Sequence, residues 1–211
     1  HTRLDGVTGV QTCALPISFD LARRGMTLGE GAGVLVLERE SDAKARGARV
    51  LARLAGVGHC CDSGHLTAPD EDGDGASRAL RMALRAAALE PEQIGFINAH
   101  GTGTPHNDRA EVAALSRALG SYAPRCPVHS VKSSIGHCMG AAGALEAIIT
   151  ALSLSQGWLP ATAGLSEPES PGSVDFVMGT GRDVSARFAA SNSFGFGGND
   201  ACLVLEAGEA P

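Results

Sequence analysis

The sequence has 211 residues, of which 44% are hydrophobic and 19% are charged, and it contains 28 glycines. This composition is typical of a compact, loop-rich α/β protein and excludes a disordered chain. The formal net charge of −6 offers no basic surface for nucleic acid, and no apolar run approaches the roughly 20 residues that cross a bilayer. We therefore expect no nucleic-acid partner and no membrane insertion.

The first half of the chain is expected to form two strands and two helices. A short apolar run after the glycine-rich LGEGAG predicts a buried strand at 33–38, and residues 41–48 begin and end like a short helix. Residues 50–61 are strand-like, and residues 75–89 have a strong helical pattern. LGEGAGV looks like a dinucleotide-binding loop, but it precedes a strand rather than a helix, so a phosphate site is excluded.

In the second half of the chain, strands and helices alternate. We expect strands at 94–99, 127–131, 187–194 and 200–207, helices at 108–120 and 141–155, and an irregular excursion rich in Pro, Gly and Ser at 156–184. Asp108 and Glu111, three residues apart, are interpreted as a capping box. The alternation predicts a layered α/β fold.

The six cysteines show neither CxxC spacing nor the density of a disulfide framework, which predicts reduced thiols in a cytoplasmic protein. HCCDSGH at 59–65 gathers two His and two Cys, but adjacent cysteines rarely both bind one zinc ion. We therefore expect no metal site there. The first 18 residues lack the charged and apolar regions of a secretory signal.

Three unusual loops follow predicted strands. HGTGT begins at His100, KSSIGH runs from Lys132 to His137, and NSFGFGGND forms a glycine turn at 192–200. Ligands in open α/β sheets gather at the carboxyl ends of strands, so we expect these loops to form one pocket. Each loop also has a structural interpretation, because a lone His after a strand is most often structural and glycines can simply permit a positive φ.

The combination of two imidazoles and an ammonium favours a site for a carbonyl or a developing enolate. Imidazole N–H groups donate hydrogen bonds to an oxyanion, and the N-terminus of the helix after His137 favours a neutral ring. Only two of the 17 Lys and Arg residues are lysines, so Lys132 suggests a need for a compact ammonium.

The chain from Phe19 to Glu206 resembles the C-terminal half of the elongating β-ketoacyl-acyl carrier protein synthases of fatty acid and polyketide systems. The resemblance rests on LGEGAGVLVLE, NAHGTGTPHND, SVKSSIGHCMGAAGALEA and ASNSFGFGGND, which occur in this order. It implies a thiolase-like αβαβα fold, usually as a homodimer. It also implies a decarboxylative Claisen condensation whose substrates are carried on the phosphopantetheine of an acyl carrier protein, with no separate cofactor and no metal.

The same resemblance assigns catalytic roles residue by residue. His100 and His137 are expected to hold the malonyl thioester carbonyl and stabilise its enolate. Lys132 is expected to support them, with Glu146 as its carboxylate partner, since an unpaired buried charge is costly. The backbone N–H of Phe196 is expected to form half of an oxyanion hole, and its ring to act as a gate for the acyl chain.

The remaining assignments concern substrate binding. Thr102 and Thr104 match positions that hydrogen-bond the phosphopantetheine arm. The loop that borders the acyl chain is expected to use Phe194, Gly195 and Gly197, with glycines, including Gly198, giving it freedom.

The nucleophilic cysteine of this family lies upstream of everything aligned here. Cys13 has no helix start after it, so it lacks the setting that activates a thiolate. Residues 7–17 look like a translated sequencing adapter, so we expect residues 1–18 to be a non-native leader and residues 19–211 to be the ketosynthase domain. Cys138 matches a packing position.

The leading hypothesis is the back half of a condensing enzyme, inactive alone because its thiol is absent. The alternative is a non-condensing chain-length factor that pairs with an active synthase, although such a subunit need not keep both imidazoles. A free-standing binding module is disfavoured because a half-domain exposes apolar faces. Acyl chain length and pathway stay open.

Overall fold

The computed structural model describes residues 17–62 and 64–208. Within these ranges the main sheet has six strands in the order β1–β8–β7–β2–β3–β5. Its strands are β1 (Ala52–Cys61), β2 (Ile94–Asn98), β3 (Pro127–His129), β5 (Asp175–Phe176), β7 (Phe188–Gly195) and β8 (Asn199–Ala207). Strands β7, β2, β3 and β5 are parallel, whereas β8 runs antiparallel to both of its neighbours. A small antiparallel pair joins β4 (Trp158–Leu159) to β6 (Arg182–Asp183).

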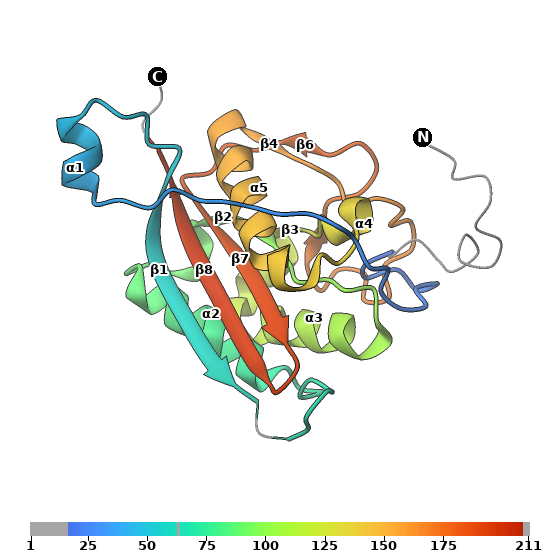
Figure 1. Ribbon diagram of the computed structural model, residues 1–211. Coiled ribbons are helices and arrows are strands. Elements are labelled where there is room, and N and C mark those ends of the chain that lie inside the picture. The colour runs from blue at the N-terminus through green and yellow to red at the C-terminus, as the bar shows by residue number, and fades with distance from the viewer. Residues whose placement is uncertain (1–16, 63, 209–211) are drawn as a thin grey trace.

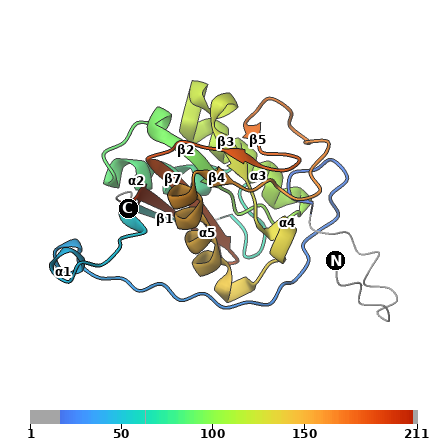
Figure 2. The ribbon, with the colours of Figure 1, turned by 90° about the horizontal axis from the view of Figure 1, so that it is seen from above.

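Helices cover both faces of the main sheet. The described helices are α1 (Glu40–Ala45), α2 (Asp74–Ala86), α3 (Pro105–Leu119), α4 (Lys132–Ile135) and α5 (Ala142–Gln156), with 3-10 turns η1 (Pro91–Gln93), η2 (Gly120–Arg125) and η3 (Met139–Ala141). Figures 1 and 2 show α2 and α3 on one face of the sheet and α5 on the other. The expected layered mixed α/β fold is confirmed, and the described residues form three layers, α, β and α.

Side-chain alternation along β2 divides the apolar core between the two faces. Ile97 packs with Leu80 and Leu115 from α2 and α3, whereas its neighbour Phe96 packs with Leu154 of α5. Successive residues of a strand point to opposite faces, so this short buried strand contributes to both cores. On the α2 side, Gly58 of β1 lies so close to the helix that a Cβ there would collide with the carbonyl oxygen of Ala79.

The expectation of a buried strand at 33–38 is wrong. These residues lie outside any strand, and Val34 and Val36 are 86% and 85% exposed. The segment crosses the molecule from the α4 side, past α5, to α1 (Figure 1), and at Gly33 its backbone lies close to Ala144 and Ile148 of α5. An apolar run indicates a preference for burial, but a strand also needs a neighbouring strand to hydrogen-bond its backbone groups. No described strand pairs with residues 33–38.

The capping-box interpretation of Asp108 and Glu111 is also wrong. Helix α3 begins three residues earlier, at Pro105, and the side chain of Thr104 caps it by accepting a hydrogen bond from the backbone N–H of Asn107. Asp108 and Glu111 therefore sit inside the helix, where their buried carboxylates are available to other backbone groups.

The remaining elements agree with expectation to within a few residues, and the irregular excursion at 156–184 contains the short strands β4, β5 and β6. Cys13 and the expected leader up to residue 16 lie outside the described residues. Among the residues that the structure describes, no helix combines the length and apolar character needed to cross a membrane.

An N-terminal strap, residues 18–29, runs beneath the loops that follow β2 and β3. Ser18 Oγ donates to the carbonyl oxygen of Gly101 at 2.6 Å, and the backbone N–H of Phe19 donates to Asp108 Oδ2 at 2.6 Å. Further along, Leu28 forms a parallel bridge with His137. The strap thus fastens two loops that are far from it in sequence.

Candidate active site

Three parallel strands deliver the predicted loops to one edge of the sheet. Strand β2 ends at Asn98, two residues before His100, and β3 ends at His129, three residues before Lys132. Strand β7 ends at Gly195 and turns directly into β8. Because β2 pairs in parallel with both β3 and β7, the carboxyl ends of all three meet at the same edge, where ligands bind in sheets of this kind.

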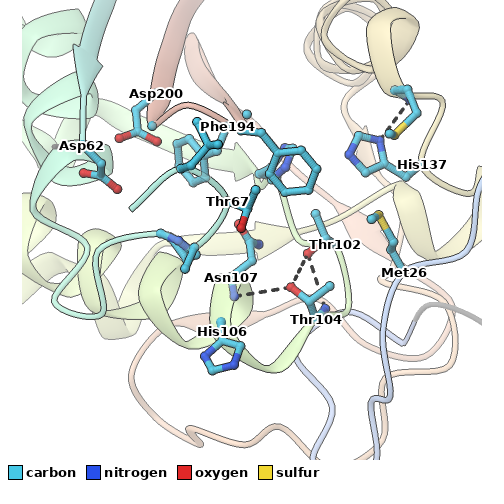
Figure 3. A pocket seen from close by; sticks show the side chains of 18 of the residues that line it. Met26, Asp62, Thr67, Thr102, Thr104, His106, Asn107, His137, Phe194 and Asp200 are labelled. Atoms are coloured by element: carbon cyan, nitrogen blue, oxygen red, sulfur yellow. Dashed lines mark hydrogen bonds between the residues drawn. The ribbon is translucent and has the colours of Figure 1, made fainter. Parts of the chain in front are cut away.

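A cavity of about 600 Å³ opens at this edge (Figure 3). Most of the residues assigned to the site from the sequence line it: His100, Thr102, Thr104, His137, Phe194, Gly195 and Phe196. Lys132 and Glu146 lie behind this lining and are almost fully buried. Gly197 is in the turn next to the cavity but does not line it.

The position of His137 is fixed by the strap and by its own loop. Its backbone N–H donates to the carbonyl oxygen of Thr27 at 2.8 Å, and its carbonyl oxygen accepts from the N–H of Gly29 at 3.1 Å. The N–H of Met139 donates to Nδ1 of the ring at 3.1 Å, so the neutral ring carries its proton on Nε2. Burial, followed by the charge of Lys132, lowers the pKa of His137 to about 4. The ring is therefore a neutral Nε2–H donor near pH 7.

His100 is held from both its backbone and its ring. Glu111 accepts from the N–H groups of His100 and Gly101, each at 2.8 Å, which orients the start of the HGTGT loop. Lys132 Nζ lies 3.2 Å from His100 Nδ1 and donates to the His100 carbonyl oxygen at 2.6 Å. Burial, Lys132 and His137 lower the pKa of His100 well below its usual value. With the ammonium at Nδ1, the neutral ring again carries its proton on Nε2.

The two rings lie close enough to act on one oxygen atom. Their centroids are 5.4 Å apart, and the ring planes are nearly perpendicular at 86°. Two neutral N–H donors that line the same cavity can both donate hydrogen bonds to one carbonyl oxygen. In this way they stabilise negative charge that develops on that oxygen, while each proton stays on its ring.

Lys132 and Glu146 form a buried ion pair behind His100. Lys132 Nζ contacts Glu146 Oε1, and Glu146 Oε2 accepts from Ser193 Oγ at 3.1 Å. Burial raises the pKa of Glu146, and Lys132 opposes that shift. Because both charged groups are paired and hydrogen-bonded, a charge next to His100 is tolerated in an interior that would otherwise exclude it.

The cavity also presents hydroxyls and aromatic rings. Thr102 Oγ1 and Thr104 Oγ1 are hydrogen-bonded at 2.9 Å and lie together at the cavity (Figure 3). The ring of Phe194 lies 5.3 Å from that of His100. Phe196 is 65% exposed at the tip of the β7–β8 hairpin, where Gly197 and Gly198 adopt φ values of +83° and +75°. Only glycine adopts such a conformation readily, so the turn depends on both.

Sequence reasoning missed several contributors. The cavity is also lined by Met26, Asp62, Thr67, His106, Asn107 and Asp200. Arg23 is buried beneath the HGTGT loop and donates to the carbonyl oxygens of Thr104 and Pro105. The carboxylates of Asp108 and Glu111 organise this loop rather than the helix end. Thr104-Pro105 is a sequence pattern typical of a helix start, and it could have placed Asn107 in the first turn of α3, next to the cavity. No local sequence pattern points to Arg23 or Asp200.

No cysteine is among the cavity-lining residues, and no cluster of three or more metal-ligating side chains occurs within residues 17–62 and 64–208. Cys138 is buried next to His137, with its Sγ near the carbonyl oxygens of Ile135 and Gly136.

The sheet topology and the site at its edge are those of a thiolase-like α/β domain. Residues 51–166 match the β-ketoacyl synthase C-terminal domain, and the chain belongs to the β-ketoacyl synthase family. A 3-oxoacyl-acyl-carrier-protein synthase 2 from Vibrio harveyi is 47% identical over 189 residues, which cover 89% of this chain and 46% of that protein. The chain thus spans about half the length of the curated relatives it matches.

Solved structures show the same fold. The ishigamide ketosynthase/chain length factor superposes with a TM-score of 0.86 at 43% identity, covering 90% of this chain and 46% of its own. A type II polyketide ketosynthase in complex with its acyl-carrier protein and bound to a hexaketide superposes with a TM-score of 0.88 at 33% identity, covering 92% of this chain and 47% of its own.

Proposed function

We propose that this domain supplies the malonyl-binding half of a β-ketoacyl-acyl carrier protein synthase active site. The observation that carries the proposal is the pair of neutral imidazoles, His100 and His137, whose rings lie 5.4 Å apart on one cavity. Their Nε2–H groups are the donors for the thioester oxygen of a malonyl group.

In the proposed reaction the carbon–carbon bond to the malonyl carboxylate breaks and carbon dioxide leaves. The electron pair of that bond forms the enolate, whose negative charge develops on the thioester oxygen between His100 and His137. Stabilisation that is stronger for this oxyanion than for the ground-state carbonyl lowers the barrier. The enolate carbon then attacks an acyl thioester, and a thiolate leaves. The acylated cysteine is supplied from outside the described residues.

The other predicted residues support this reaction. Lys132, paired with Glu146, keeps His100 neutral and orients its proton outward. Thr102 and Thr104 are the hydroxyl partners for the amides of a phosphopantetheine arm. Phe196, on its glycine turn, is the gate to the acyl side, and its N–H is one half of a second oxyanion hole. Phe194, Gly195 and Gly197 form the adjoining wall.

In this proposal the protein is a homodimer that works in the cytoplasm with an acyl carrier protein. Its substrates are carried on the acyl carrier protein, and no separate cofactor is needed. A relative's structure contains an acyl-carrier protein bound to its ketosynthase, which supports the choice of partner. Residues 19–211 are the ketosynthase domain in this proposal, and residues 1–18 are a non-native leader.

A chain-length-factor subunit is the second candidate, because one similar structure pairs a ketosynthase with such a factor. The convergence of His100, His137 and Lys132 favours the condensing subunit, since a partner subunit has no need of two donors on one oxygen.

The test uses the full-length protein that contains this chain. His100→Ala and His137→Ala should each abolish decarboxylation of malonyl carrier, followed as released carbon dioxide, while acyl transfer to the enzyme thiol persists. Because the pKa of His137 is about 4, the decarboxylation rate should not depend on this ring between pH 5 and pH 8. His59→Ala, an exposed position on β1, is the matched control. Decarboxylation that survives both histidine substitutions would refute the proposal, a wild-type protein that releases no carbon dioxide would identify a non-condensing subunit, and loss of acyl transfer alone would reverse the roles.

A further inference from the structure

Two carboxyl groups face each other on the cavity wall away from His137. Asp62 follows β1, and Asp200 lies in β8; Figure 3 shows them together on one side of the cavity, with Phe194 between them and His137. Asp62 is 9% exposed and Asp200 is 5% exposed. Asp62 Oδ1 and Asp200 Oδ2 have no hydrogen-bond donor among the described residues. A Cβ on Gly75, in the first turn of α2, would collide with both oxygens, so they occupy the same small space.

The neighbouring charges do not neutralise this pair. Asp62 Oδ2 accepts from the backbone N–H of Asp70 at 2.9 Å. From α2, Arg78 pairs with Asp74 and donates to a β1 carbonyl oxygen, and from α3, Glu111 adds a third acidic group. Burial, Asp62 and Glu111 raise the pKa of Asp200 to about 7, and Arg78 opposes them. Two carboxyls in contact without a cation ionise together only at a large cost, so below about pH 7 one of them keeps a proton.

The pair also joins the two segments that shape the cavity entrance. The N–H of Asp62 donates to the carbonyl oxygen of Gly198 at 2.8 Å, and the N–H of Gly197 donates to that of Leu66 at 2.7 Å. Asp200 pairs in register with Phe194, whose ring contacts His100. Residues 62 and 64–70, called here the entrance segment, are therefore attached to residues 195–199, the Phe196 turn.

We propose that Asp62 and Asp200 share one proton and that this proton latches the entrance segment to the Phe196 turn. When the proton leaves to solvent in the cavity, two adjacent carboxylates repel each other across the junction, and the turn that carries Phe196 loosens. The inference rests on the proposed function only in taking that turn as the entrance to the substrate cavity. Asp62 and Asp200 are positioning residues, because they act on the cavity through the turn.

A proton fits this place better than a metal cation does. Two carboxyls supply too few ligands for a metal ion, and no group of three or more metal-ligating side chains occurs among the described residues. A proton on one of the two unpartnered oxygens can be donated to the other in a hydrogen bond. Both oxygens then have a hydrogen-bond partner.

Hydrogen–deuterium exchange on the full-length protein tests the latch without turnover. After correction for intrinsic rates, amides of residues 64–70 and 195–199 should exchange at least about threefold faster at pH 8.5 than at pH 6.5, because protection follows the fraction of latched molecules. Peptides from β2 should show no such change and serve as the internal control. Asp200→Asn keeps a permanent N–H donor toward Asp62, so its exchange should stay slow at both pH values. Asp62→Asn, which places the donor on the other side, should behave in the same way.

Two results would overturn the latch. One is exchange in these segments that is independent of pH in the wild-type protein, or equally pH-dependent in Asp200→Asn. The other is protection that follows potassium or magnesium concentration at fixed pH, which would assign the pair to a cation. Neither result bears on decarboxylation by His100 and His137, so failure of the latch and failure of the proposed function are separate outcomes.

Discussion

Lys132 Nζ lies 3.2 Å from Nδ1 of His100 while contacting Glu146 on its other side, so one ammonium serves both an ion pair and an imidazole. Lys132→Met should lower the free energy of unfolding by about 3–5 kcal/mol, because it leaves the carboxylate of Glu146 buried without its partner. The same change removes a positive charge beside His100, so the pKa of that ring should rise. Urea denaturation measures the first effect, and ¹⁵N NMR of the imidazole measures the second.

The double variant Lys132→Met/Glu146→Gln provides the control for this pair. It removes both charges, and most of the lost stability should return because no uncompensated charge remains. A double variant as unstable as Lys132→Met would show that packing of the lysine stem, rather than charge pairing, accounts for the loss.

His129 predicts an unusual response to acid. Neither ring nitrogen has a hydrogen-bond partner among the described residues, and burial lowers the pKa of His129 to about 3. Between pH 3 and pH 6.5 the unfolded chain binds a proton that the folded chain does not, so this residue makes stability fall as the pH falls through that window. His129→Leu should remove the effect and gain up to about 4 kcal/mol near pH 3, at about 1.4 kcal/mol for each pKa unit.

Thermal denaturation at several pH values would measure the difference between His129→Leu and the wild-type chain. Glu111 and Asp200, whose pKa values are raised to about 7, act in the opposite direction below pH 7, but they are common to both proteins and cancel. His59→Leu, at an exposed position on β1, should leave the acid response unchanged. Equal acid sensitivity in His129→Leu and wild type would refute the assignment.

Gly198 is the least replaceable residue of the Phe196 turn. Its φ is +75°, and a Cβ would collide with the carbonyl oxygen of Asp62. Gly198→Ala should therefore lower the free energy of unfolding by at least about 1–2 kcal/mol, the cost of the left-handed backbone alone, and displace the entrance segment. Gly64→Ala, where a Cβ meets nothing within 4 Å, is the matched control. Denaturant midpoints that agree within error for the two variants would contradict this reasoning.

The exposed run at Val34, Leu35, Val36 and Leu37 predicts self-association of the 211-residue chain. Contiguous exposed apolar side chains of this kind drive association in water. Val34→Ser/Val36→Ser should shift sedimentation toward a single smaller species. Val57→Ser, at a half-exposed position in β1, should not. A wild-type chain that sediments as a monodisperse monomer would contradict the expectation.

The sequence predicted the site better than it predicted some of the surrounding structure. HGTGT, KSSIGH and the glycine turn could be placed together because each follows a strand, and parallel pairing brings strand ends to one edge. The exposed run failed as a strand because apolar character carries no information about which neighbour will supply backbone partners. Asp108 and Glu111 were misread because their spacing suggested a local cap, whereas their bonds go to Phe19, Gly103, His100 and Gly101. The contact of Asp62 with Asp200 depends on the register in which β1 and β8 pair, and no local sequence pattern predicts that register.

The strap gives the site an unusual folding dependence. Phe19 and Asp108 are 89 positions apart, so seating the strap closes a large loop, and the entropy of that closure opposes it until the sheet exists. We expect refolding to produce the α/β layers first and the His137 geometry last. A protease cut in the exposed run after Gly33 would turn the strap into a separate peptide, and the alignment of His137 would then vary with protein concentration.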